Sequence, residues 1–65
     1  MDIDKIRKDS STMKSFEDCT TLEEKKERAK LNMYYWLYVE DDTESVEYWR
    51  GVVKGIEVAE GLMKQ

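Results

Sequence analysis

Apolar residues recur every three or four positions along the last third of the chain, between residues 43 and 64. One helical face carries Val46, Trp49, Val53, Ile56 and Met63, with Val52 and Ala59 on its flank. Spacing of this kind is typical of an amphipathic helix, whereas the alternation typical of a strand is not sustained. We therefore expect a helix over about residues 43–64.

A second long helix is predicted over about residues 21–40. Thr21 and Glu24 have the spacing of a capping box, which marks the start of a helix. No glycine or β-branched residue follows until Val39, so nothing in this stretch disfavours a helix. The side chains expected to face the other helix are Leu22, Ala29, Met33, Trp36 and Leu37.

An acidic cluster, residues 40–42, separates the two helices. Acidic side chains destabilise the C-terminal end of a helix but stabilise the N-terminal end of the next one. Asp41 and Glu44 again have the spacing of a capping box. Two long helices joined by about three residues are expected to fold back on each other as an antiparallel hairpin.

The first twenty residues are polar and rich in serine and threonine. Four apolar residues lie at helical offsets, namely Ile3, Ile6, Met13 and Phe16. The triplet Ser10-Ser11-Thr12, however, is unfavourable in the interior of a helix. We expect a short helical turn or arm here. The chain is then all-α, with an arm or short helix over residues 1–20 and a helical hairpin over residues 21–65.

The first long helix also carries large apolar and aromatic side chains on the side opposite its hairpin stripe, namely Leu31, Tyr34, Tyr35 and Tyr38. A hairpin of two helices can cover only one side of this helix. The other side packs either against residues 1–20 of the same chain or against another molecule. We favour the intermolecular contact, because Tyr and Trp are enriched at protein interfaces.

Residues with little or no side chain recur every four positions in the second helix, flanked by Tyr48 and Leu62: they are Gly51, Gly55 and Ala59. A glycine costs roughly 1 kcal/mol relative to alanine inside a helix, so this ridge suggests close packing. It either makes room for aromatic side chains within the hairpin or is crossed by a helix of another protomer. The expected protein-binding residues are therefore Leu31, Tyr34, Tyr35, Tyr38, Tyr48, Gly51, Gly55 and Leu62.

A chain of 65 residues can bury a core worth only roughly 3–5 kcal/mol. With one cysteine and no histidine, neither a disulfide within the chain nor a zinc site is expected to add to this. We therefore expect a homo-oligomer, most simply a dimer that forms a four-helix arrangement. Fifteen acids against eleven bases give a net charge of −4, which argues against direct binding of nucleic acid or of an anionic membrane.

No motif for catalysis, cofactor binding or metal binding is found. The chain lacks a histidine and a glycine-rich phosphate loop, and its acidic turn lacks the glycine of a calcium loop. We expect no enzyme and no cofactor, and we expect Cys19 to behave as a small buried hydrophobic residue. Without a leader or an apolar run of about 20 residues, the expected location is the cytoplasm.

The segment of residues 48–59, together with residues 32–36, resembles small acidic helical-hairpin proteins encoded in phage and prophage genomes, including short proteins that block bacterial defence systems. The resemblance covers about half of the chain and rests on aromatic and glycine helix packing. It implies a stoichiometric binder of a host protein in the bacterial cytoplasm, with no catalytic residues.

Our interpretation is a small non-enzymatic protein-binding modulator, an inhibitor or adaptor that acts by occlusion through an aromatic helix face. One alternative is an acidic mimic of nucleic acid that competes for a DNA-binding site through Asp41, Asp42, Glu44, Glu47, Glu57 and Glu60. Another is a structural oligomerisation module. The sequence does not name the target.

Overall fold

The computed structural model describes residues 2–64; 83% of these residues are helical, and none of them lies in a strand. Its elements are α1 (Ile3–Thr12), the 3₁₀ turn η1 (Phe16–Asp18), α2 (Leu22–Tyr34), the π-helical segment η2 (Tyr35–Val39) and α3 (Thr43–Met63). The prediction of an all-α chain is confirmed.

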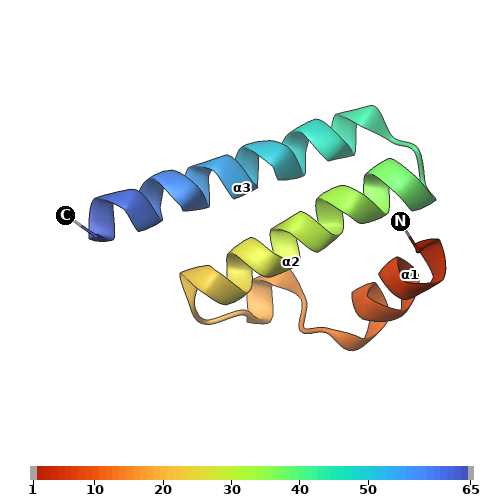
Figure 1. Ribbon diagram of the computed structural model, residues 1–65, viewed down its shortest axis with the longest axis horizontal. Helices are drawn as coiled ribbons and strands as arrows, with labels where there is room; N and C mark the ends of the chain where they lie inside the picture. The colour runs from red at the N-terminus through yellow and green to blue at the C-terminus, as the bar shows by residue number, and fades with distance from the viewer. Residues whose placement is uncertain (1, 65) are drawn as a thin grey trace.

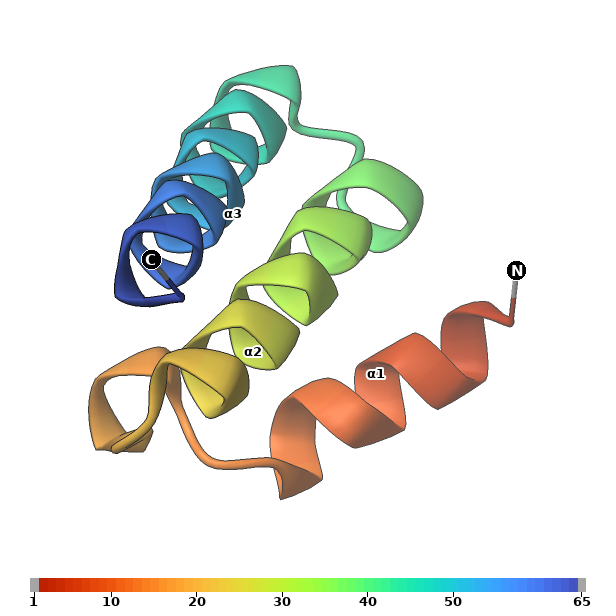
Figure 2. The same ribbon diagram turned by 60° about the vertical axis from the view of Figure 1, so that its left-hand side comes forward.

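The helix α2 lies between the other two helices (Figure 1, Figure 2). It runs antiparallel to α3 on one side, and α1 packs on its other side against α2 and η2. No contact joins α1 to α3 within residues 2–64. One side of α3 therefore faces α2 and η2, and Phe16 of η1 also contacts α3 through Trp49.

Side chains cap both long helices. The hydroxyl of Thr21 accepts a hydrogen bond from the backbone N–H of Glu24 at 3.1 Å, as the capping box predicts. At α3 the cap is Asp42, whose carboxylate accepts from the N–H groups of Glu44 and Ser45. The prediction of Asp41 as the capping residue is wrong: its φ of 53° lies in the left-handed region, so Asp41 forms the turn itself.

The last turn of the first hairpin helix widens into a π-helix. The N–H of Glu40 bonds to the carbonyl of Tyr35, five residues back, at 3.2 Å. This wider turn rotates the side chains that follow Tyr34 away from the positions that a regular helix would give them. Leu37 is consequently 40% exposed, and its predicted place in the stripe facing α3 is wrong.

The N-terminal segment is more regular than expected. In place of a short turn, α1 continues through Ser10, Ser11 and Thr12, and the hydroxyls of Ser11 and Thr12 donate to the carbonyl of Lys8 at 2.9 Å. Ile6 and Cys19 are buried, which confirms the expectation for the cysteine.

The core lies between α2 and α3 and is small. Ala29 is fully buried against Val53 and Ile56, and partly buried apolar side chains surround them: Phe16, Leu22, Trp49 and Val52. The ring of Phe16 meets that of Trp49 edge to face at 5.4 Å, so η1 contributes to this core. Among the described residues no large side chain is fully buried.

Met63 does not belong to the core as predicted, since it is 75% exposed. The reason is length: the C-terminal end of α3 extends past the start of α2, so its last turn has no helix opposite it (Figure 1).

Candidate protein-binding face

A continuous apolar line runs along the side of α3 that does not pack on α2. It consists of Tyr48, Gly51, Gly55, Val58 and Leu62, spaced alternately by three and four residues. Tyr48 is 65% exposed, Val58 59% and Leu62 67%. We call these five residues the outward face of α3. Because Val53 and Ile56 bury a different side of the same helix against α2, α3 is apolar on two sides.

The glycines of α3 lie beside open space. A Cβ atom placed on Gly51, Gly55 or Gly61 would meet nothing within 4 Å beyond its own stretch of helix. The interpretation that the ridge makes room for aromatic side chains within the hairpin is therefore wrong. Close approach of the two helices is provided instead by Ala29 on α2, whose small side chain meets the other side of α3. Overpacking by a larger side chain at Gly55 is accordingly not expected within a single chain.

The aromatic side of the first hairpin helix has a different environment. Leu31, Tyr34 and Tyr35 are half-buried and Tyr38 is 45% exposed, and α1 packs against the segment that carries them. Part of the space around this segment is thus occupied by α1 of the same chain. Figure 2 shows α1 running beside α2.

The side chain of Tyr35 is hydrogen-bonded to Glu40, the residue that ends η2. Its hydroxyl donates a hydrogen bond to Glu40 at 3.0 Å, and this bond raises the pKa of the Tyr35 phenol. Arg7 of α1 is close enough to oppose that shift through its positive charge. The hydroxyl of Tyr35 is therefore bound within its own chain, at the residue that ends η2.

The turn before α3 forms an acidic end of the molecule. From residue 31 to residue 49, every charged side chain is an acid: Glu40, Asp41, Asp42, Glu44 and Glu47. Residues 1–39 carry eight acids and eight bases, so the whole net charge of −4 arises from residues 40–65. Glu44 precedes Tyr48 by one helical turn, which brings this charge to the beginning of the outward face.

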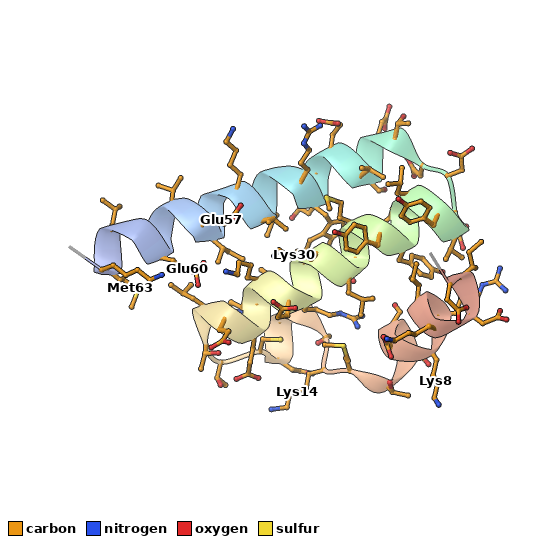
Figure 3. All side chains as sticks on the ribbon, viewed as in Figure 1. Lys8, Lys14, Lys30, Glu57, Glu60 and Met63 are labelled. Atoms are coloured by element: carbon orange, nitrogen blue, oxygen red, sulfur yellow. The ribbon has the colours of Figure 1, made fainter. Side chains whose placement is uncertain are left out.

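A shallow pocket of about 300 Å³ lies at the opposite end of α3, lined by Leu22, Glu60, Met63 and Lys64. Its carboxylate is already paired, since Lys26 donates to Glu60 at 2.9 Å, and this hydrogen bond raises the pKa of Lys26. Glu60 and Met63 project from the last turns of α3 (Figure 3). Apart from this paired carboxylate, the lining holds one charged side chain, Lys64, and we do not take the pocket as the functional site.

Within residues 2–64, no group of three or more His, Cys, Asp or Glu side chains is arranged to hold a metal ion. None of the helices there combines the length and the apolar character needed to cross a membrane.

The predicted site residues thus separate into two groups on different helices. Tyr48, Gly51, Gly55 and Leu62 lie together and exposed on α3, whereas Leu31, Tyr34, Tyr35 and Tyr38 lie on α2 and η2, the elements that α1 contacts. Sequence reasoning omitted Val58, although its position three residues after Gly55 was the signal that places it on the same line.

Comparisons with protein-family models, with curated proteins and with solved structures find no match to this chain. They identify no family, and the function is therefore argued from the geometry of α3.

Proposed function

We propose that this chain is a small non-enzymatic protein-binding modulator that attaches to another protein through the outward face of α3 and occludes the surface it covers. One observation supports this most directly: three large apolar side chains, each more than half exposed, are aligned with two open glycines. Contiguous exposed apolar surface of this kind marks interaction sites in small proteins.

The geometry of the face suits a helix or a similar elongated apolar element. Seams with alternating spacings of three and four residues are the ones that pack against a partner helix. Gly51 and Gly55 leave a shallow middle between Tyr48 and Leu62, where a partner side chain or backbone can come close. An inhibitor or adaptor of a host protein, as the resemblance to phage-encoded proteins implies, is a role that such a face can fill.

The proposal is tested by placing a photo-cross-linking amino acid on α3 in extracts of the source cells. A cross-linker at Val58 should give one discrete adduct with another protein. The matched control is a cross-linker at Glu57, which is exposed on a different side of the same helix and should give no such adduct. Equal adducts from both positions, or none from Val58, would contradict the proposal.

A second copy of this chain is the competing occupant of the face, and two α2–α3 hairpins would then form the expected four-helix arrangement. Sedimentation of the purified chain separates the two cases. A dimer has twice the mass of the 7.8 kDa chain, and its stability rises with protein concentration.

The acidic end supports a second candidate function, a mimic of nucleic acid that occupies a DNA-binding site. Its supporting observation is that all five charged side chains between residues 40 and 47 are acids. A mimic should be displaced from its target by duplex DNA and should lose affinity steeply with added salt. A complex held mainly by the outward face should withstand both treatments.

A further inference from the structure

We infer that the partner of the outward face is an apolar helix that carries Lys or Arg at the end meeting Glu44 and Glu47. This inference rests on the proposed function and adds the chemistry of the partner to it. The argument uses the charges beside the face, the open glycines and the consequences of pairing two identical chains.

The charges beside the outward face are unevenly distributed. Glu44 lies on the line itself, one turn before Tyr48, and Glu47 lies beside it; both are exposed. Glu47 has a weak partner, Arg50 at 3.3 Å, in a pair of which both side chains are about 70% exposed. The only base directly beside the line is Lys54, near its middle. A partner with complementary charge is therefore basic at one end and neutral or acidic at its middle.

A second copy of the chain does not meet this requirement. In a parallel pair of α3 helices, Glu44 and Glu47 would face the same acids of the other copy. In an antiparallel pair that crosses at Gly55, the two Lys54 side chains would meet near the two-fold axis. Both arrangements place like charges together, which disfavours self-association, whereas a basic helix gains an attraction at the same position.

The open glycines favour a helix with bulky apolar side chains. A Cβ at Gly55 has space around it in the isolated chain, so that space is free for a partner side chain. Tyr48 and Leu62 flank the space and can contact the partner on both sides of the crossing. This arrangement resembles the insertion of an amphipathic helix against an apolar face, with anchors every three or four residues.

The experiment uses the purified chain and two synthetic helical peptides of about 20 residues, close to the length of α3. Both peptides carry leucines at alternating spacings of three and four. One carries lysines beside the seam in one half, and the other carries glutamates there. We expect the lysine peptide to bind about tenfold more tightly or better in fluorescence anisotropy at physiological salt.

Two glycine variants test where the peptide binds. Gly55→Gln places a bulky polar side chain on the outward face, and Gly61→Gln places the same side chain beside the line near the end of α3, with equal space around it. We expect Gly55→Gln to weaken the lysine peptide by about tenfold and Gly61→Gln to change affinity less than about twofold. Circular dichroism checks that both variants remain helical.

Two glutamate variants test the charge requirement. The double variant Glu44→Gln, Glu47→Gln should remove most of the preference for the lysine peptide. Glu57→Gln, an exposed acid on a different side of α3, should leave that preference unchanged. Figure 3 labels Glu57 on α3.

Three results would each overturn the inference. The two peptides could bind equally well, or the two glycine variants could weaken binding equally. Glu57→Gln could also reduce the preference for the lysine peptide as much as the double variant at Glu44 and Glu47 does. A dimer of the chain alone that Gly55→Gln dissociates would also overturn it, in favour of a second copy. If the inference fails while the Val58 cross-link to another protein persists, the proposed function stands and only the partner's chemistry is wrong.

Discussion

Arg28 is a charged residue with buried hydrogen-bond donors that lack acceptors within residues 2–64. Its Nε and Nη1 atoms are buried, and neither finds a hydrogen-bond acceptor among the described residues. Burying such donors without partners costs about 1–3 kcal/mol. The aliphatic stem of the side chain still contributes packing on α2.

We therefore expect Arg28→Met to raise the free energy of unfolding by about 1 kcal/mol, since methionine keeps the stem and removes the orphaned donors. Urea denaturation measures the change. The control is Arg50→Met, at an exposed arginine paired only with Glu47, which should stay within about 0.5 kcal/mol of the wild type. A loss of stability in Arg28→Met beyond that of the control would mean that the guanidinium has acceptors in solution.

We expect the protein to lose stability at high pH because of two hydrogen-bonded pairs, Lys26–Glu60 and Tyr35–Glu40. The hydrogen bond to Glu60 raises the pKa of Lys26 above its ordinary 10.5, and the bond to Glu40 raises the pKa of Tyr35 above its ordinary 10.0. The folded chain thus holds both protons more tightly than the unfolded chain. Their contribution is fully present below those ordinary values and is lost as the pH rises through the raised ones.

The measurement is the urea midpoint at about pH 9 and about pH 11, on either side of the start of this window. The double variant Glu60→Gln, Tyr35→Phe removes both linked titrations and should show a smaller decline than the wild type. An equal decline in both proteins would mean that other groups cause the alkaline sensitivity.

At the scale of the element, α1 is attached to the molecule by few buried contacts. Ile6 is the residue that the helix buries, at 5% exposure, whereas Ile3 on the same helix is 42% exposed. Loss of a buried isoleucine side chain typically costs about 2 kcal/mol or more. We expect this loss to weaken the packing of α1 against α2 and η2, because Ile6 is not part of the core between α2 and α3.

We expect Ile6→Ala to speed amide hydrogen exchange in α1 much more than in α2 or α3. Ile3→Ala makes the same chemical change at an exposed position and should leave the exchange rates near those of the wild type. If Ile6→Ala speeds exchange equally in all three helices, α1 docking and the α2–α3 core form a single cooperative unit.

For the whole molecule, two adjacent aromatic residues have opposite environments. Trp49 packs against the core and contacts Phe16 of η1, whereas Tyr48 is 65% exposed on the outward face. Trp49→Ala should therefore cost about 3 kcal/mol, enough to unfold much of a domain this small. Tyr48→Ala should keep its helical circular-dichroism signal and lose affinity for a partner. Unfolding of both variants to the same extent would place Tyr48 in the structural core.

Residues close together in the chain determined much of this protein. The two long helices, the Thr21 cap and the turn at residues 40–42 follow from hydrophobic spacing and capping chemistry, which act within a few residues. The same local reasoning recognised Tyr48, Gly51, Gly55 and Leu62 as one side of a helix.

Contacts between distant residues decided the rest. The π-helical turn at Tyr35 displaces Leu37 from the side that a regular helix would give it, and no local pattern predicts such a turn. Whether the glycines of α3 are packed or open depends on which side of that helix meets Ala29, and both sides are apolar in sequence. Periodicity shows that a side of a helix is apolar, but only the packing of α1 and α3 around α2 determines which apolar sides are covered and which one faces outward.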